Sequence, residues 1–214
     1  MLMPGTQTHD PRRFAAVRRA MARQKIQSLL VTHLPDVRWL CGFTGSNAAL
    51  AVTSGRAALF TDGRYTTQAK EETRGARVVI AKKSALRECC ALLEGWAKKA
   101  WFDPQHTTVA DLSLMRSGVS AKKRRGFFVP LDRDLVPALR MVKDDAELDL
   151  MAKAAAMGCQ LFEDMLPRIA AGRAEVTLAA ELEYEARRRG ADGMSFETIV
   201  ASGERSAANC STSS

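Results

Sequence analysis

The stretch AALAVTSGRAALFT, residues 48–61, decides the fold, because it places two short apolar segments on either side of a Ser54-Gly55 turn. Short apolar segments joined by a Gly-containing turn are typical of paired β-strands. We therefore predict strands over 48–53 and 56–61. Outward from this pair, strands are predicted at 28–32, 77–81, 100–102 and 127–129, and helices at 35–40, 65–72, 86–98, 108–116 and from Pro11 onward. Strands that alternate with helices indicate a layered α/β domain, which we assign to residues 1–134.

A long amphipathic helix is predicted after this domain. Residues 144–169 carry apolar side chains at alternating spacings of three and four, which is the period of one helix face. The stripe consists of Leu148, Met151, Ala155, Cys159, Phe162 and Leu166. Because an apolar stripe is stabilised when another apolar surface covers it, we expect this helix to have a partner.

A second helix over 177–189 and a strand over 196–203 are predicted next. With the long helix, they are assigned to an α+β domain over 144–214, and residues 135–143 are assigned to a linker. Two helices and one strand in roughly 80 residues give a core of marginal stability. The second domain is therefore predicted to be incomplete.

The composition is that of a folded protein, with 46% hydrophobic and 26% charged residues. Five cysteines form an odd number without paired spacings, so no disulfide framework is predicted. No segment approaches the roughly 18 apolar residues of a membrane span. Residues 1–13 lack the apolar stretch of a secretory signal. We therefore expect a cytoplasmic protein without a membrane partner.

The formal net charge of +8 raises the question of a nucleic-acid partner. The strongest basic tract is 122–125, KKRR, directly before the apolar segment 126–130. A charged loop at the entrance of a strand is usually a solvated surface. Aromatic residues make up 6% of the chain and do not alternate with the basic ones, so no platform for stacking bases is indicated. We therefore predict no nucleic-acid partner.

Several short segments resemble one known family in their order and spacing. Residues 42–47, GFTGSN, and 59–65, LFTDGRY, resemble a creatinase-type amino-terminal domain. Residues 139–148, LRMVKDDAEL, are similar to the junction that follows it, and 193–196, GMSF, with 198–203, TIVASG, are similar to the strand that enters the catalytic cleft. The family is that of creatinase, prolidase and aminopeptidase P, the pita-bread metallopeptidases. The resemblance implies a creatinase-type layered α/β domain followed by an incomplete α+β pita-bread domain.

The resemblance implies hydrolysis of the peptide bond before proline, by two divalent metal ions bridged by water or hydroxide. Oxygen-rich ligands suit manganese, cobalt or zinc. In the family, two aspartates, one histidine and two glutamates bind the metals, and all of them follow the strand that corresponds to 196–203. The histidines of this chain are His9, His33 and His106, without metal-ligand spacing. We therefore expect no catalytic residue, no metal ligand and no bound metal in these 214 residues.

The resemblance stops after Ser206-Ala207. The family continues with a proline and a cleft histidine, whereas this chain continues with Ala208-Asn209-Cys210. A late change of reading frame and a natural truncation would each produce such a junction.

The resemblance offers two candidate substrate-binding residues, Phe196 and Ile199. In a complete relative they would be apolar wall residues near the metal cleft, and strand alternation is taken to place both on one face. Proline-containing peptides are expected to bind only in the complete enzyme.

Two further groups have both a functional and a structural interpretation. Cys41 could act as a nucleophile with His33 as base, but a small buried cysteine is the favoured interpretation. Asp62, Arg64 and Tyr65 could reach a site in a neighbouring subunit. Alternatively, Asp62 caps the next helix and pairs with Arg64. We treat these residues as structural.

Two functions remain open from the sequence. The first is membership of the Xaa-Pro aminopeptidase and dipeptidase lineage, with the 214-residue chain expected to be inactive by itself. The second is a non-catalytic oligomerisation or interaction module built on the amino-terminal α/β domain. In either case we expect a homo-oligomer formed through that domain.

Overall fold

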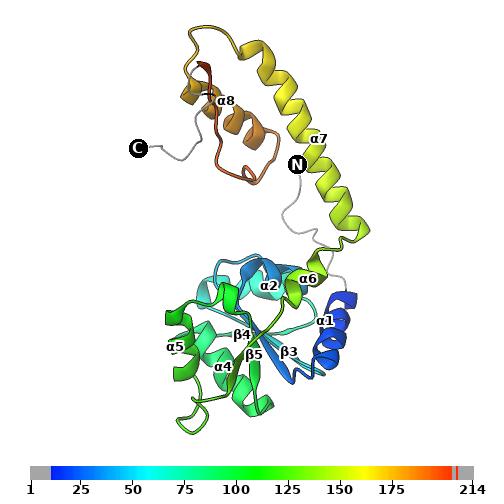
Figure 1. Cartoon of the computed structure of the whole chain (residues 1–214), viewed down its shortest axis with the longest axis vertical. Helices are drawn as coiled ribbons and strands as arrows, with labels where there is room; N and C mark the ends of the chain where they lie inside the picture. The colour runs from blue at the N-terminus through cyan, green and yellow to red at the C-terminus, as the bar shows by residue number, and fades with distance from the viewer. Residues whose placement is uncertain (1–10, 204–205, 207–214) are drawn as a thin grey trace. The chain divides into compact units, whose positions relative to one another are not determined.

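The computed structural model describes residues 11–203 and residue 206 (Figure 1). The chain divides into two compact units, with the division between Val142 and Lys143. His9 and the predicted departure from the family at Ala208-Asn209-Cys210 lie outside the described residues. In the described part of the chain, no helix combines the length and the apolar character that crossing a membrane requires.

A mixed sheet forms the centre of the first unit (Figure 1). It has six strands in the order β4-β3-β2-β1-β5-β6. The strands are β1 (Ser28–Val31), β2 (Ala49–Thr53), β3 (Ala57–Thr61), β4 (Arg77–Ile80), β5 (Ala100–Phe102) and β6 (Phe128–Pro130). Strand β2 is antiparallel to β1 and β3, and the other neighbouring pairs are parallel. The hairpin predicted from the opening stretch is confirmed, because Leu50 lies opposite Leu59 and the Thr53 N–H donates to the Arg56 carbonyl at 2.8 Å.

Side chains from the two faces of the sheet enter two separate cores, because successive residues of a strand point to opposite faces. Leu29 and Val31 of β1 lie in one core, and Leu30 lies in the other. In β2, Leu50 lies in the first core and Ala51 in the second. Burial of both faces explains why these strands are apolar throughout instead of alternating with polar residues.

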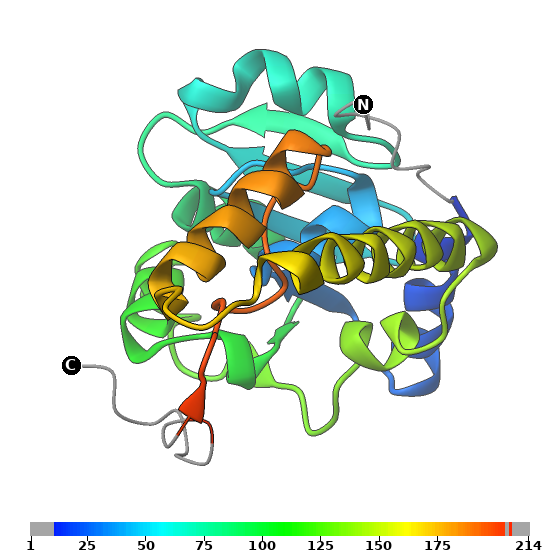
Figure 2. The same cartoon turned by 90° about the horizontal axis from the view of Figure 1, so that it is seen from above.

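Helices cover both faces of the sheet, which gives a three-layered unit (Figures 1 and 2). The first core lies under α1 (Pro11–Arg23), α2 (Leu34–Cys41), α3 (Thr66–Glu72) and α6 (Val136–Arg140), and the second under α4 (Ala85–Trp96) and α5 (Val109–Ser117). Val17 and Leu40 fill the first core, and Leu93 and Met115 fill the second. The layered α/β fold predicted for this part of the chain is confirmed.

The segment 135–143, predicted to be a linker, differs in the structure. Its first part forms α6, and Leu135 and Val136 are buried in the first core. Arg140, at the end of α6, forms an ion pair with Asp36 of α2. Apolar residues of the segment therefore pack onto the sheet, and the first unit extends to residue 142.

The second unit contains α7 (Asp145–Met165) and α8 (Glu175–Arg188). The start of α7 is a capping box, in which the Asp144 carboxylate accepts from the Glu147 N–H at 2.9 Å and the Glu147 carboxylate accepts from the Asp144 N–H at 3.0 Å. The helix ends earlier than predicted, in a 3-10 turn, because Pro167 has no N–H to continue the helical hydrogen bonds. Helix α8 begins before the predicted start at residue 177.

The apolar stripe predicted on α7 is exposed in the described structure. Leu148, Met151 and Phe162 have 52%, 54% and 63% of their surface exposed. The buried residues of α7 are Leu161 and Met165, which lie off the stripe, and the helix packs against α8. The partner surface that the sequence predicts for this stripe is therefore not α8.

The strand predicted over 196–203 is wrong for this structure, because none of these residues pairs with a strand. A strand needs a neighbour to satisfy its N–H and C=O groups, and the described part of the second unit contains no strand. Instead, the Ser202 N–H and hydroxyl donate to the Glu175 carboxylate at 2.8 and 2.9 Å. These bonds hold the segment against the start of α8.

Candidate functional site

The two segments of the first unit that resemble the creatinase-type domain meet at one edge of the sheet. Asp62 follows β3 and accepts from Asn47 Nδ2 at 2.6 Å. It also accepts from Nε and Nη2 of Arg64, both at 2.9 Å. The Arg64 hydrogen bond, followed by that of Asn47, holds the pKa of Asp62 far below its usual range. Asp62 also caps the following 3-10 turn by accepting from the Arg64 N–H at 3.1 Å.

Tyr65 completes this cluster. Its hydroxyl lies 2.7 Å from the Ser46 hydroxyl, and this hydrogen bond lowers the pKa of Tyr65. Its ring packs edge-on against Phe43, with centroids 5.6 Å apart, and the Arg64 guanidinium lies 5.2 Å from its centroid. A Cβ at Gly45 would lie 2.3 Å from the Phe43 ring, so glycine is required there. These contacts support the structural interpretation, although the Arg64 side chain remains 69% exposed.

Cys41 has the contacts of a structural residue. It is buried, and its thiol donates to the Val37 carbonyl at 3.2 Å. Burial raises the pKa of Cys41 to about 11, which keeps the reactive thiolate scarce at neutral pH. His33, the candidate base, stacks on His106 with ring centroids 3.7 Å apart. The nucleophile interpretation therefore has no geometric support.

A cluster of charged side chains, not predicted from the sequence, lies beyond the carboxyl ends of β1 and β5. His33 Nδ1 lies 3.2 Å from Asp36, and His106 Nδ1 lies 2.8 Å from Asp103. The Asp36 side chain is only 3% exposed and accepts from Arg140 Nη1 at 2.6 Å. The sequence carries no local signal for this cluster, because it depends on the parallel pairing of β1 with β5, which brings the ends of both strands to one edge.

Phe196 and Ile199, the predicted substrate-binding residues, are exposed by 81% and 61%. Residues three positions apart lie on opposite faces of a regular strand, so Phe196 and Ile199 would not share a face, and the prediction that they do was wrong. Between them, the Thr198 hydroxyl is buried without a hydrogen-bond partner among the described residues. A substrate-binding role for Phe196 and Ile199 stays a prediction.

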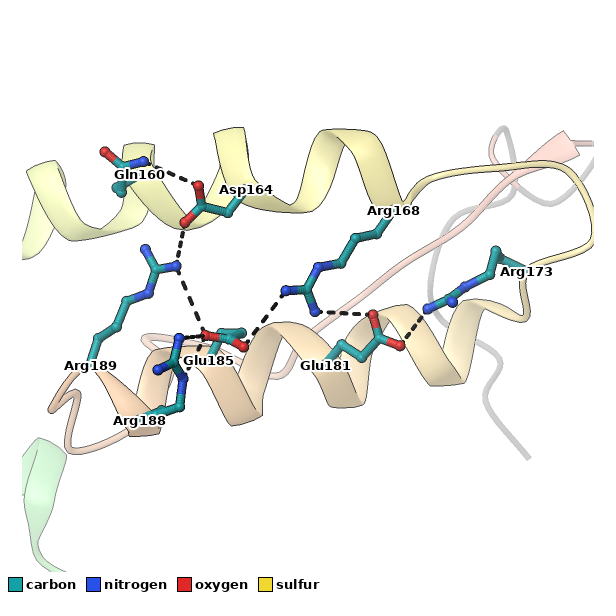
Figure 3. A network of polar contacts seen from close by, with 8 residues as sticks. All are labelled: Gln160, Asp164, Arg168, Arg173, Glu181, Glu185, Arg188 and Arg189. Atoms are coloured by element: carbon teal, nitrogen blue, oxygen red, sulfur yellow. Dashed lines mark hydrogen bonds and ion pairs between the residues drawn. The ribbon is translucent and has the colours of Figure 1, made fainter.

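A network of ion pairs joins α7 to α8 (Figure 3). Glu185 of α8 lies 2.8 Å from Arg188, 3.7 Å from Arg168 and 3.9 Å from Arg189. The Arg188 hydrogen bond is the main cause that lowers the pKa of Glu185. The remaining pairs are Asp164 with Arg189 and Gln160, and Glu181 with Arg168 and Arg173. The carboxylates of Asp164, Glu181 and Glu185 are therefore all paired with arginine, and these pairs stabilise the packing of α7 against α8.

The described residues do not fit a metal centre. Within residues 11–203, no group of three or more His, Cys, Asp or Glu side chains is placed to hold a metal ion. The carboxylates of the clusters described above are paired with arginine or histidine. We therefore assign no step of a metal-dependent reaction to them.

Comparison with known proteins covers both units. Residues 13–142 match the Creatinase/Prolidase N-terminal domain, and residues 149–213 match Metallopeptidase family M24. The Bacillus subtilis peptidase YqhT is 34% identical over 183 residues, which is 85% of this chain and 50% of that protein. An Xaa-Pro dipeptidase of Pyrococcus horikoshii is 24% identical over 190 residues, which is 87% of this chain and 51% of that protein.

Solved structures agree with this assignment. An Xaa-Pro dipeptidase from Bacillus anthracis has a TM-score of 0.83 at 29% identity, over 91% of this chain and 54% of its own. The N-terminal domain of the cytoplasmic peptidase PepQ from Mycobacterium tuberculosis has a TM-score of 0.55 at 29% identity, over 61% of this chain and 100% of its own.

A layered α/β domain followed by the first helices of a peptidase domain defines a creatinase-type metallopeptidase architecture. The chain belongs to the creatinase/prolidase family, and its second unit matches Metallopeptidase family M24. The family predicted from a few short segments is thus confirmed. The chain spans about half the length of the relatives and solved full-length enzymes it matches.

Proposed function

We propose that the protein to which these residues belong hydrolyses the peptide bond before proline, as an aminopeptidase or a dipeptidase. The observation that carries the proposal is the match of residues 149–213 to a metallopeptidase family directly after the creatinase-type domain. The Xaa-Pro dipeptidases among the similar proteins support the substrate class. Two divalent ions, manganese, cobalt or zinc, would supply an activated water when bound.

The 214 residues are inactive by themselves in this proposal. The described residues offer no group that could hold a metal ion, so the ligands would come from outside the described structure or from a partner chain. Phe196 and Ile199 would then line the substrate cleft only after further residues have packed over them. Both side chains are exposed in the described structure, so they are available for such packing.

Peptide hydrolysis tests the inactivity. The 214-residue chain, of verified intact mass, is incubated with a peptide that has proline in the second position, with each of the three metals in turn. We expect no release of the first residue above the blank that contains metal alone. The Bacillus anthracis Xaa-Pro dipeptidase, assayed in parallel, is the positive control. Turnover by the pure chain that a chelator abolishes would overturn the inactivity.

The coding sequence beyond codon 214, read in all three frames, tests the lineage separately. The proposal expects one frame to encode two aspartates, one histidine and two glutamates in a segment that continues the metallopeptidase match. If no frame does so, the peptidase proposal fails and the non-catalytic function described next is favoured.

In this second function, the first unit acts as an oligomerisation or interaction module. Its two cores are formed from its own residues, and a related N-terminal domain has been solved by itself, which supports independent folding. Sedimentation velocity of the 214-residue chain and of residues 11–142 tests the module. We expect both samples to form the same oligomer. If both samples are monomeric, the oligomerisation module is contradicted.

A cytoplasmic location belongs to the same proposal. Cys41, Cys89 and Cys90 are buried free thiols, and burial raises the pKa of Cys90 to about 12. Buried free thiols of this kind, among the residues that the structure describes, suit a reducing compartment.

A further inference from the structure

The directions of the six strands bring five chain connections to one edge of the sheet. Strands β1, β3, β4, β5 and β6 begin at this edge, and β2 ends there, because only β2 is antiparallel to its neighbours. We name this the basic edge. It is formed by the connections 24–27, 54–56, 73–76, 97–99 and 118–127.

The basic edge carries charge of one sign. Its connections contain nine Lys or Arg residues and no Asp or Glu. The nine are Lys25, Arg56, Arg74, Lys98, Lys99, Lys122, Lys123, Arg124 and Arg125.

The positive and negative charges of the opposite edge are equal in number. Its connections 32–33, 42–48, 62–65, 81–84, 103–108 and 131–135 contain four Asp and four Lys or Arg. The excess positive charge of these connections therefore lies at one edge of the sheet. The sequence alone does not reveal this, because the nine residues are separated by whole helices and strands.

The cations of the basic edge are exposed, except that Lys123 is half-buried. Among the described residues, the carboxylate paired with one of them is Glu94, which lies 4.0 Å from Lys123 Nζ. Arg74 donates to the Glu71 and Thr73 carbonyls, and the Arg56 guanidinium lies 5.6 Å from the Trp96 ring. None of these latter contacts neutralises a charge.

Helix ends explain only a small part of this accumulation. Helices α1, α3, α4 and α5 end in the connections that lead to the basic edge. A helix C-terminus carries roughly half a negative charge, so four of them offset about 2 positive charges. Nine cations are far more than capping these helices requires.

We propose that the basic edge binds the phosphate backbone of double-stranded nucleic acid without reading its sequence. A six-stranded sheet with strands about 4.8 Å apart has an edge about 24 Å long. Duplex DNA carries one negative charge for each ~1.7 Å of its axis, so about 14 phosphates fall within that length. A row of cations on an extended edge matches a linear polyanion.

The side chains of the edge favour this partner over a membrane or single-stranded bases. Among the described residues of the five connections, the large apolar side chains Ile26, Val119 and Phe127 are buried, so none can insert into a bilayer. Phe127 lies under Lys123, and Trp96 lies half-buried beside Arg56, so neither offers a free ring for stacking. Binding through phosphates alone is independent of sequence. No nucleic-acid partner was predicted from the tract 122–125 alone. The fold places four other connections that carry Lys or Arg at the same edge of the sheet as this tract.

Fluorescence anisotropy with the full 214-residue chain tests the proposal. The probe is a fluorescein-labelled DNA duplex of about 24 base pairs, long enough to span the edge several times over. If about five phosphates are contacted, the logarithm of the association constant falls with the logarithm of salt concentration with a slope of about −4.5. A rise from about 50 to about 200 mM NaCl then weakens binding by roughly 500-fold.

The decisive variant is Lys99→Glu/Lys122→Glu/Arg125→Glu, which reverses three exposed charges on the basic edge. We expect it to bind the duplex at least about tenfold more weakly at low salt and to reduce the salt slope by about two to three. Circular dichroism and the urea midpoint are used to check that the variant is folded.

A matched control variant is Lys82→Glu/Lys83→Glu/Arg133→Glu, which makes the same change of net charge at the opposite edge. In about 0.1 M salt we expect it to change the affinity less than about threefold, because screening there limits the reach of exposed charges to about 10 Å. Equal losses in both variants would show that net charge, and not the edge, attracts DNA, and would overturn the proposal. Absence of duplex binding at low salt would also overturn it, as would binding to vesicles of anionic lipid without binding to DNA.

Discussion

Replacing Arg140 by methionine is expected to lower the free energy of unfolding of the first unit by about 2–3 kcal/mol. The Asp36 carboxylate is 3% exposed, and Arg140 Nη1 donates to it at 2.6 Å. Methionine keeps the length and apolar stem of the side chain but leaves a buried carboxylate with only His33 beside it, at 3.2 Å. Because the Arg140 side chain is 34% exposed, water partly compensates, and the loss is below that of a fully buried pair.

Urea unfolding followed by tryptophan fluorescence measures this change in the free energy of unfolding. Trp39, Trp96 and Trp101 all lie in the first unit, so the signal reports on that unit alone. Arg133→Met is the matched control, because Arg133 is exposed and the same change there should stay within about 0.5 kcal/mol. An Arg140 variant as stable as the Arg133 variant would show that the ion pair does not hold α6 on the sheet.

A Gly118→Ala variant should lose about 2 kcal/mol of the same unfolding free energy. The added Cβ would lie 2.5 Å from the Arg87 carbonyl oxygen and 3.0 Å from Cys90 Cβ. The first of these is a backbone atom of α4, so the clash is relieved only if α4 and α5 move apart. Gly118 has a φ of −80°, which alanine adopts freely, so the expected loss is entirely steric.

Gly95→Ala provides the control for this variant, with an effect of opposite sign. Gly95 lies in the last turn of α4, and apart from its chain neighbours and the backbone of its own helix no atom lies within 4 Å of the position its Cβ would take. Alanine there should raise stability by roughly 0.5 kcal/mol, since it restricts the unfolded chain and favours the helix. If both glycine variants are stabilised, the close approach of α5 to α4 is wrong.

Features that depend on neighbouring residues in the chain could be predicted from the sequence. The hairpin around Ser54-Gly55 and the start of α7 close to residue 144 are of this kind. The strand over 196–203 was not correct, because a strand depends on a partner that local pattern does not supply. Helix α6 was missed because a short segment that contains Pro137 resembles a linker until its packing on the sheet is known.

The candidate sites show the same limit. His33 and His106 stack only because β1 and β5 pair, and this pairing joins segments on either side of three other strands in the chain. The pairing of Asp62 with Arg64 was predictable because the two residues are close in sequence. The basic edge required the directions of all six strands.

Native mass spectrometry of the 214-residue chain with added manganese tests the central claim, that these residues belong to a metallopeptidase family but do not themselves form its metal centre. The account predicts the mass of the metal-free chain, with only weak adducts that a brief buffer exchange removes. A stable species with two manganese ions per chain would contradict it.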